Sequence, residues 1–254
     1  MGILNATPDS YYAPSRLTGL DNLEFQADQL LEQGADWLDL GGCSTRPGAT
    51  WPSPDEEWAR LDGAFTRLRT RFGSEVPLSV DTFRSEIARR ALDQGADLVN
   101  DISGGILDPA IWNAAADARA PYILTHYPSV PNAPLLDADT AALVTVRELS
   151  ERLIAAREAG LNDVILDPGI GFGKTPEGNL RLVRDLALLC EFPHPLLVGV
   201  SRKSLITRTL GIAATDALAA TSAVHALALE RGAQILRVHD PREARQVIQL
   251  VARF

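Results

Sequence analysis

The stretch "VPLSVDTFRSEIARRALDQGADLVNDISGG" (residues 76–105) contains the unit from which the fold is predicted. A short apolar run ends at Asp81, an amphipathic segment follows over 84–94, and a second apolar run leads to Asn100-Asp101. Continuous apolar runs, rather than alternating ones, are typical of parallel strands whose sheet is covered by helices. Gly95 stands where a helix ends in the left-handed conformation. The stretch therefore predicts a strand, a helix and a second, parallel strand.

The same unit recurs eight times along the chain. Strand-like runs are predicted at 2–5, 35–42, 76–82, 96–105, 121–126, 163–168, 195–201 and 233–240, and helices at 21–33, 54–72, 84–94, 108–119, 137–159, 176–191, 203–231 (interrupted at Gly211) and 241–253. Eight such units in 254 residues predict an α/β protein, a single (β/α)8 TIM barrel that forms one domain over 1–254. A doubly wound open sheet is the alternative, because the number of units does not prove closure.

Composition and charge restrict the class of partner. The formal net charge of −9 argues against a nucleic-acid-binding surface and against an anionic membrane surface. No apolar run approaches about 18 residues, so no membrane-spanning segment is expected. Cys43 and Cys190 lack the spacing of metal ligands, and a reduced, cytoplasmic protein is the simplest expectation.

Polar residues stand at the end of every predicted strand. They are Asn5, Asp39, Asp81, Asn100-Asp101, His126, Asp167, Ser201 and Arg237-His239. Each of them alone is explained equally well as a turn cap or a loop-ordering hydrogen bond. Barrel enzymes, however, build their sites at the carboxyl ends of the strands. Eight polar strand ends on one rim therefore predict a polar pocket.

The glycine-rich stretch "LDPGIGFGKT" (166–175) does not match a nucleotide phosphate loop. Pro168 stands in place of the first glycine of the P-loop motif, and Lys174 stands where a dinucleotide motif needs its third glycine. We expect these glycines to let the backbone pass close beneath a flat ligand, with Asp167 facing the pocket. Phe172 is equally consistent with stacking on that ligand and with filling the rim.

Cations follow the last two predicted strands. The sequence "SRKS" places Arg202 and Lys203 at a helix start, where a cation opposes the helix dipole, and this favours an anionic or electron-rich ligand over solvated surface cations. Arg237 and His239 lie on the same side of the last strand. Together with Arg46 they are expected to form one anion pocket, although each alone also fits a structural ion pair.

Seven motifs, in this order, resemble those of the dihydropteroate synthase family. They are "GILNATPDS" (2–10), "GGCSTRPGA" (41–49), "SVDT" (79–82), "NDISGG" (100–105), "LDPGIGFGKT" (166–175), "VGVSRKS" (198–204) and "RVHD" (237–240), and they span nearly the whole chain. The resemblance implies a (β/α)8 barrel, usually a homodimer. It implies a transferase that condenses 6-hydroxymethyl-7,8-dihydropterin diphosphate with 4-aminobenzoate to give 7,8-dihydropteroate and diphosphate in folate biosynthesis. It also implies assistance by Mg²⁺ and competition by sulfonamides.

The resemblance assigns a role to each candidate residue. It implies Asp81, Asn100, Asp167 and Lys203 for the pterin ring; Arg46, Arg237 and His239 for the diphosphate; Thr45, Pro47, Phe172 and Ser204 for aminobenzoate; and Asn5 for the metal, with Lys203, Arg237, His239 and Asp167 as catalytic residues. These roles make chemical sense, because a carboxylate accepts two hydrogen bonds from an aminopyrimidine edge and an amide both donates and accepts. No protein nucleophile is implied, so neither cysteine is given a catalytic role.

Four departures from the family pattern keep two alternatives open. Ala13 stands where the family has a loop aspartate, Cys43 where it has glutamate and Gly178 where it has histidine, and the 125–134 segment differs throughout. None of these changes removes a residue assigned to the ring or the diphosphate. One alternative is a non-catalytic pterin-binding paralogue, which the altered loops favour. The other is a barrel of the methyltetrahydrofolate-corrinoid methyltransferase type, which has no diphosphate to hold and so leaves "SRKS" and "RVHD" unexplained.

Overall fold

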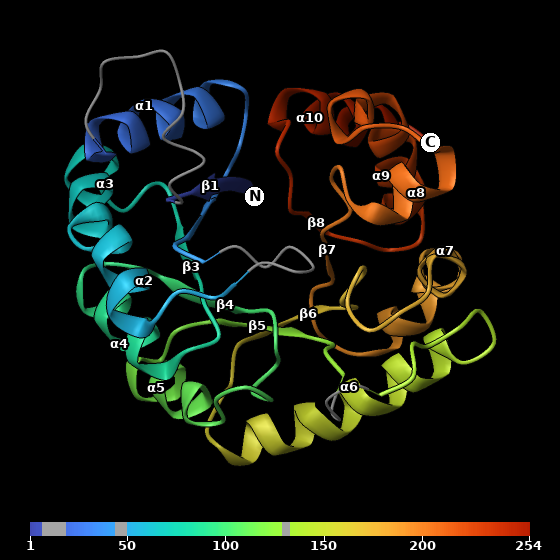
Figure 1. Cartoon of the computed structure of the whole chain (residues 1–254), viewed down its shortest axis with the longest axis horizontal. Helices are drawn as coiled ribbons and strands as arrows, with labels where there is room; N and C mark the ends of the chain where they lie inside the picture. The colour runs from blue at the N-terminus through green and yellow to red at the C-terminus, as the bar shows by residue number, and fades with distance from the viewer. Residues whose placement is uncertain (7–18, 44–49, 129–132) are drawn as a thin grey trace.

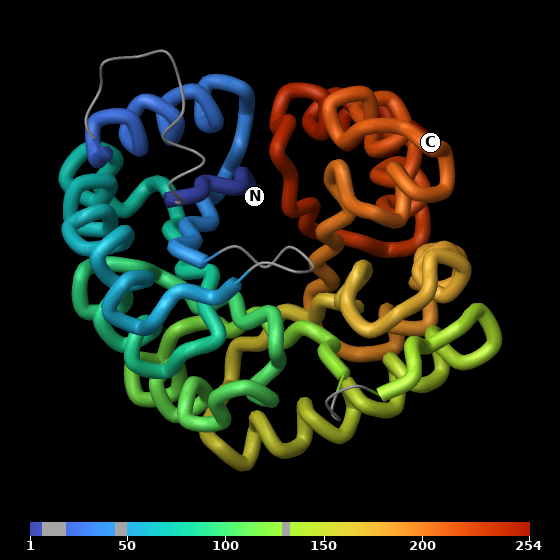
Figure 2. The backbone as a smooth tube through the Cα atoms, in the orientation of Figure 1, coloured from blue at the N-terminus to red at the C-terminus, as the bar shows by residue number. Residues whose placement is uncertain are grey.

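The computed structural model is a barrel of parallel strands surrounded by helices (Figures 1 and 2). It describes residues 1–6, 19–43, 50–128 and 133–254. In these residues the strands are β1 (Gly2–Asn5), β2 (Leu38–Gly41), β3 (Leu78–Asp81), β4 (Leu98–Asp101), β5 (Tyr122–Thr125), β6 (Val164–Asp167), β7 (Leu197–Val198) and β8 (Ile235–Leu236). The predicted order of strands is therefore confirmed.

Parallel pairing closes the barrel. Strands β1 to β6 form one sheet in sequence order, and β7 pairs with β8. Leu166 at the end of β6 bridges to Leu196, just before β7, and its amide donates to Pro195 O at 2.8 Å. At the other junction Gly2 bridges to Val238, and the Ile3 amide donates to Val238 O at 2.9 Å. These two junctions make the (β/α)8 prediction correct and the open sheet wrong.

The helices follow the strands, with two differences from the prediction. They are α1 (Gly19–Glu32), α2 (Pro54–Leu61), α3 (Ala64–Phe72), α4 (Ser85–Asp93), α5 (Ala110–Ala118), α6 (Ala141–Glu158), α7 (Pro176–Arg184), α8 (Ser204–Leu210), α9 (Leu218–Glu230) and α10 (Pro241–Val251), with 3-10 turns η2 (Leu186–Glu191) and η3 (Ala214–Asp216). The predicted helix over 54–72 is divided in two because Gly63 adopts a φ of 74°. The predicted helix over 176–191 tightens into η2 after Arg184.

Four glycines end helices immediately before strands, as the sequence predicts. Gly34, Gly95, Gly160 and Gly232 have φ values of 95°, 105°, 93° and 97°. A side chain at such a φ strains the backbone, whereas glycine adopts it freely. Each glycine therefore reverses the chain so that the next strand runs parallel to the previous one.

Register places the carboxyl ends of neighbouring strands at one level. Asn5 pairs with Gly41, and Gly41 pairs with Asp81. Asp81 in turn pairs with Asn100. Further round the sheet, Thr125 pairs with Asp167. The polar residues that end these strands consequently share one rim of the barrel.

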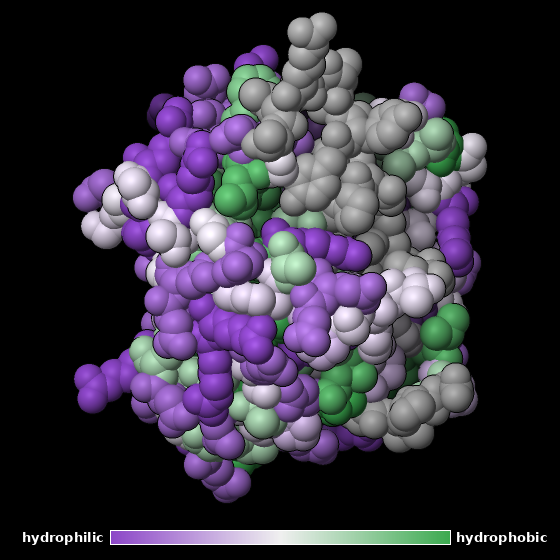
Figure 3. All heavy atoms as spheres, turned by 60° about the vertical axis from the view of Figure 1, so that its left-hand side comes forward, coloured by the Kyte–Doolittle hydropathy of each residue, from purple (hydrophilic) through white to green (hydrophobic). Residues whose placement is uncertain are grey.

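The face over α1 to α4 is mostly hydrophilic, with apolar side chains scattered over it (Figure 3). Ion pairs between α1 and α3 lie on this face, including Arg67 with Asp21 at 2.7 Å and Arg71 with Asp28 at 2.8 Å. Exposed pairs of this kind contribute little to stability, typically below about 1 kcal/mol each. Among the helices of the described residues, none has the length and apolarity needed to cross a membrane.

A small apolar layer in the barrel gives a test of the packing. Met1, Leu98, Ile123, Ile165 and Leu197 are buried together. Replacing Leu98 with alanine leaves a cavity in this layer and is expected to lower the free energy of unfolding by about 2–5 kcal/mol in urea titrations. Leu250→Ala on α10, where the leucine is 62% exposed, is the matched control and is expected to change it by less than about 0.5 kcal/mol. Equal losses in the two variants would contradict this packing.

Candidate active site

A single guanidinium joins two strand-end carboxylates at the rim. Arg237, directly after β8, donates from Nε to Asp39 Oδ2 and from Nη2 to Asp81 Oδ2, each at 2.6 Å. Asp39 is fully buried and Asp81 is 6% exposed. A buried carboxylate is stable only when it is paired and hydrogen-bonded. The barrel therefore brings the predicted ring-binding acid and the predicted diphosphate-binding cation into direct contact.

Asp39 links this ion pair to the next strand. Its Oδ2 also accepts a hydrogen bond from Asn100 Nδ2 at 3.0 Å. The sequence showed Asp39 as a polar strand end but gave it no role. Its place on β2, beside the strand that ends in Asp81, was the signal available. In the structure it fixes both the amide of Asn100 and the guanidinium of Arg237.

Two carboxylate oxygens at this junction remain open to a hydrogen-bond donor. Oδ1 of Asp39 and Oδ1 of Asp81 are buried and have no hydrogen-bond partner within the described ranges. Buried polar atoms are almost always hydrogen-bonded, so an unpartnered pair at a rim suits a ligand that brings donors. The site thus has acceptor capacity beyond the ion pairs that hold it together.

Burial shifts the protonation of the acids. Desolvation raises the pKa of Asp81 to about 7, against the opposing charge of Arg237 and with a further increase from the neighbouring Asp39. Desolvation also raises the pKa of Asp167, while Lys203, the Gly169 amide and Arg237 oppose the shift. The two carboxylates and two cations of the rim thus lie within electrostatic reach of one another.

Lys203 lies over the loop that follows β6. Its ammonium donates to Ile170 O at 2.8 Å and sits 5.0 Å from the centre of the Phe172 ring. Burial lowers the pKa of Lys203 to about 8, although Asp167 and Asp81 oppose the shift. Phe172 packs beside Tyr127, with ring centres 5.9 Å apart, so the ring lines the rim beneath a cation.

Arg202 does not face a ligand, which corrects the interpretation of "SRKS". Its Nε and Nη2 donate to the two oxygens of Asp240, each at 2.8 Å, and Nη1 donates to Ala214 O at 2.8 Å. It also has a φ of 55°, which turns its side chain away from that of Lys203. Only the lysine of the two adjacent cations belongs to the site.

The glycines of 166–175 are required mainly by protein neighbours. Gly169, Gly171 and Gly173 have φ values of 65°, 94° and 61°. A Cβ on Gly169 would lie 1.9 Å from His126 O, and one on Gly173 would lie 2.1 Å from Pro128 Cγ. Protein neighbours thus require glycine at these two positions, and the close approach of a flat ligand stays a prediction. The amides of this loop also point to protein acceptors, such as Gly169 N to Asp167 Oδ1 at 2.7 Å, which agrees with the rejection of a phosphate loop.

The remaining predicted residues lie around the same rim or outside the description. Exposed His239 approaches Ser201 Oγ through Nδ1 at 3.0 Å, Ser204 begins α8, and half-buried Asn5 ends β1. Thr45, Arg46 and Pro47 of the predicted site, and the departure at Ala13, lie outside the described residues.

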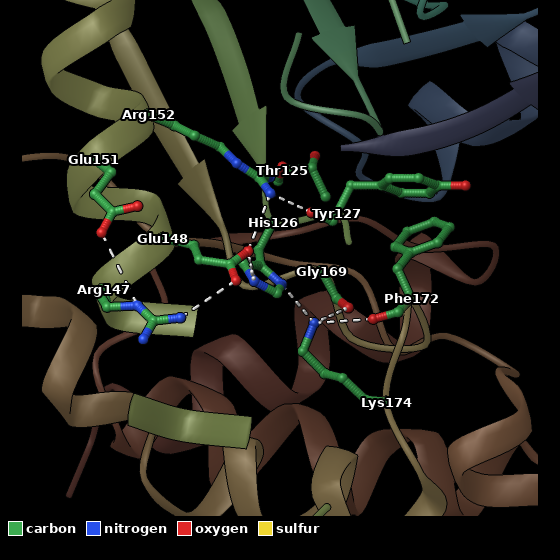
Figure 4. Close-up of polar contacts among 10 residues, drawn as sticks. All are labelled: Thr125, His126, Tyr127, Arg147, Glu148, Glu151, Arg152, Gly169, Phe172 and Lys174. Atoms are coloured by element: carbon green, nitrogen blue, oxygen red, sulfur yellow. Dashed lines mark hydrogen bonds and ion pairs between the residues drawn. The ribbon is translucent and has the colours of Figure 1, made fainter. Parts of the chain in front are cut away.

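A second polar cluster lies beside the 166–175 loop (Figure 4). The sequence showed His126 as a polar strand end but did not predict this cluster. Lys174 is 6% exposed, and its ammonium contacts His126 Nδ1 at 2.9 Å. His126 Nε2 faces Glu148 Oε2 at 3.2 Å, and Glu148 also pairs with Arg152. The available signal was compositional, because Lys174 and Lys203 are the only lysines among 24 basic residues.

Few groups in the described part of the chain suit metal binding or thiol chemistry. No group of three or more His, Cys, Asp or Glu side chains there is placed to hold a metal ion. Burial raises the pKa of the Cys43 thiol to about 11, so it stays protonated at neutral pH. Cys190 is exposed and free. Neither cysteine is placed to act as a nucleophile.

Comparison with known proteins identifies relatives along the whole chain. Residues 1–239 match the family described as pterin binding enzyme. A dihydropteroate synthase of Synechocystis is 40% identical over 98% of this chain and 88% of its own. A Xanthomonas albilineans dihydropteroate synthase solved with 4-aminobenzoic acid superposes with a TM-score of 0.91 at 38% identity, over 99% of this chain and 91% of that one. A Clostridium difficile dihydropteroate synthase solved in the presence of pteroic acid gives 0.91 at 32% identity, over 99% and 94%.

Gly169 and Gly211 offer a matched pair for testing the close approach beneath the loop. Both have a φ of 65°, but a Cβ on Gly211 would meet nothing within 4 Å. Gly211→Ala is expected to cost about 1–2 kcal/mol from backbone strain alone. Gly169→Ala adds a collision with His126 O, and we expect a loss of about 3 kcal/mol or more in urea unfolding. Losses of the same size would show that the loop is not pressed against β5.

Proposed function

The chain belongs to the pterin-binding enzymes and, among them, to the dihydropteroate synthases, and from this premise we propose how its rim residues act. The reaction is the condensation of 6-hydroxymethyl-7,8-dihydropterin diphosphate with 4-aminobenzoate, a transferase reaction of folate biosynthesis. The observation that carries the proposal is the pair of hydrogen bonds from Arg237 to Asp39 and Asp81. They support the proposal because they bring two strand-end acids and an arginine together at one mouth of the barrel.

The pterin ring is held by acceptors on one edge and by donors on the other. Asp81 Oδ1 is buried and open, so it accepts from the aminopyrimidine edge. Asn100 is oriented by Asp39, and Asp167 is oriented by the Gly169 amide. Lys203, which lies between Asp167 and the loop, contacts the carbonyl side of the ring. These four residues surround a flat heterocycle without any covalent contact.

The diphosphate is held by Arg237, His239 and Arg46. Arg237 Nη1 has no hydrogen bond to the described residues and is available to a phosphate oxygen. Mg²⁺ is proposed to bind with the diphosphate, because Asn5 alone offers one amide oxygen and the described residues form no metal-binding cluster. Such a donor set fits Mg²⁺, which is commonly held by few protein ligands together with substrate phosphates and water. The ion would neutralise charge on the leaving group.

The proposed reaction needs stabilisation of a methylene cation and of the leaving diphosphate, and it needs no nucleophilic side chain. The bond from the pterin methylene carbon to the diphosphate oxygen breaks, and its electron pair leaves on the diphosphate. Arg237 and His239 stabilise that developing negative charge. Asp81 and Asp167 hold the electron-rich ring, which stabilises the methylene cation. The arylamine nitrogen forms the new C–N bond and loses one proton to water.

Aminobenzoate is proposed to enter on the side of Phe172. This ring lies beneath Lys203, and Ser204 begins the helix directly after that lysine. Thr45 and Pro47 would complete the subsite from the loop after β2. Sulfonamides, as analogues of aminobenzoate, would compete for the same place.

A direct assay tests the function. The protein is incubated with the pterin diphosphate, 4-aminobenzoate and Mg²⁺, and we expect stoichiometric 7,8-dihydropteroate and diphosphate. Omission of aminobenzoate should abolish the pteroate product. Tight pterin binding without either product would identify a non-catalytic paralogue and overturn the proposal.

A homodimer in the cytoplasm is proposed as the working form. Helices α6, α7 and α8 pack side by side and carry exposed apolar side chains, among them Leu143 (69% exposed), Leu180 (44%) and Leu210 (55%). Exposed apolar side chains on adjacent helices favour burial against a second copy. The apolar, alanine-rich stretch 213–229 is a second candidate for the interface, and it contains Leu227, which is 42% exposed. Sedimentation of the purified protein tests the assembly.

The protonation of Asp81 predicts a pH dependence of pterin binding. Burial raises the pKa of Asp81 to about 7 in the free protein. Only the ionised carboxylate can accept two hydrogen bonds from the aminopyrimidine edge of the pterin. Affinity for a free pterin is therefore full above pH 7 and is expected to fall about tenfold per pH unit below it, with proton release on binding. Calorimetry from pH 5.5 to 8.5 in two buffers measures both. Asp81→Asn should bind weakly and without this dependence, and an unchanged slope in that variant would reject the assignment.

A further inference from the structure

The chain uses lysine at only two positions. Of 24 basic residues all but Lys174 and Lys203 are arginine. Both lysines lie at the mouth of the barrel, and Lys203 already belongs to the proposed pterin site. Lysine differs from arginine in presenting a compact ammonium with three donors rather than a planar fork. A lysine at 174 in so arginine-rich a chain therefore directs attention to what its compact ammonium contacts.

The ammonium of Lys174 uses all three donors inside the protein. It donates to Gly169 O at 2.9 Å, to Phe172 O at 3.0 Å and to His126 Nδ1 at 2.9 Å (Figure 4). Gly169 O also accepts from the Phe172 amide at 3.0 Å. The side chain thus turns back on its own loop, clamps both ends of the turn 169–172 and ties that turn to the end of β5.

The clamped turn presents the groups that face the proposed substrates. Ile170 O, inside the turn, accepts the hydrogen bond from Lys203 at 2.8 Å, and the Phe172 ring lies 5.0 Å beneath the same ammonium. At its start the Gly169 amide orients Asp167 at 2.7 Å. A shift of this turn would therefore move the Phe172 ring and the anchor of Lys203 together.

The other end of the clamp, His126, lies close to Glu148 of α6. Accepting from Lys174 at Nδ1 leaves His126 with its proton on Nε2, which faces Glu148 Oε2 at 3.2 Å. Burial and the charges of Lys174 and Arg152 lower the pKa of His126 to about 2, so the ring stays neutral. Arg152 pairs with Glu148 at 3.2 Å and donates to Tyr127 O. Among the described residues His126 Nε2 has no hydrogen-bond partner, so the acceptor of Lys174 is held by its burial after β5 rather than by Glu148.

We propose that Lys174 is a positioning residue for the condensation: its ammonium sets the turn 169–172 so that Phe172 meets aminobenzoate in register with the pterin that Lys203 holds. The proposal rests on the proposed function for the identity of the substrates. Lys174 contacts neither substrate. It acts through the carbonyl groups of Gly169 and Phe172, and arginine does not replace it because a planar fork cannot satisfy three convergent acceptors from the same position.

The charge surroundings of Lys174 predict when the clamp weakens. Burial lowers its pKa to about 7; Lys203 and Arg152 add to the shift, while Asp167 and Glu148 oppose it. His126 faces it as a neutral acceptor. Above pH 7 the ammonium loses one donor, so Lys174 can donate to only two of its three acceptors, Gly169 O, Phe172 O and His126 Nδ1.

Steady-state kinetics of two variants and a control test the positioning role. We expect Lys174→Met to lower kcat/KM for 4-aminobenzoate about 100-fold, mainly through KM, and to raise KM for the pterin diphosphate by a smaller factor, because the turn also anchors Lys203. Lys174→Arg should fail to rescue. Arg181→Met, which removes an exposed cation from α7, should match the wild type. Full rescue by arginine, or equal losses for both substrates, would overturn the proposal.

A second measurement does not depend on activity. Protein labelled with ¹³C at lysine Cε should give two side-chain signals, and Lys174→Arg assigns them by removing one. We expect the Lys174 signal to titrate near pH 7, and hydrogen exchange of the 168–175 peptide to quicken about tenfold in Lys174→Met but not in Arg181→Met. The proposal would be rejected if the Lys174 signal titrated near about 10.4, as in a solvated lysine, and hydrogen exchange of the 168–175 peptide did not change in Lys174→Met. An inactive wild type with these same signals would reject the proposed function and leave the clamp standing.

Discussion

The site depends on one guanidinium shared by two buried carboxylates. Arg237 reaches Asp39 and Asp81 across 198 and 156 residues of sequence, so the contact exists only when β8 has closed against β1. Taking either carboxylate out of water without a partner would cost several kcal/mol. Barrel closure and assembly of the site are therefore one event, because the cation that neutralises the acids arrives with the last strand.

Register converts this ion pair into a site. Parallel pairing sets Asn5, Gly41, Asp81 and Asn100 at one level. The short side chains that end β1, β3 and β4 therefore reach the same space. The absence of a side chain at Gly41 matters here, since a Cβ there would lie 3.3 Å from Asp81 Cβ. The same regular geometry that satisfies the backbone hydrogen bonds thus determines which polar groups can act together.

The sequence predicted which strand ends are polar but not which of them bond to one another. Periodicity and helix-ending glycines predicted the units of the barrel, because these are local properties. The partners of Asp39, Arg202 and Lys174 depend on side-chain orientation after closure, and no local pattern contains that information. The departure at Gly178 has a neighbour that the sequence did not indicate. A Cβ on Gly178 would lie 2.3 Å from Leu136 O, so the backbone before α6 leaves no room for a larger residue at 178.

Arg237 also bears on how the proposed diphosphate would be held. Its charge is already offset by Asp39 and Asp81 before any substrate arrives, and these bonds raise its pKa further above the ordinary value for arginine. A diphosphate must therefore bring or recruit positive charge of its own. Under the proposed function, Mg²⁺ carried with the substrate would supply that charge beside Arg46 and His239. The ion pairs of Arg237 would then stabilise the ionised acids that hold the pterin, and the added positive charge would stabilise the leaving group.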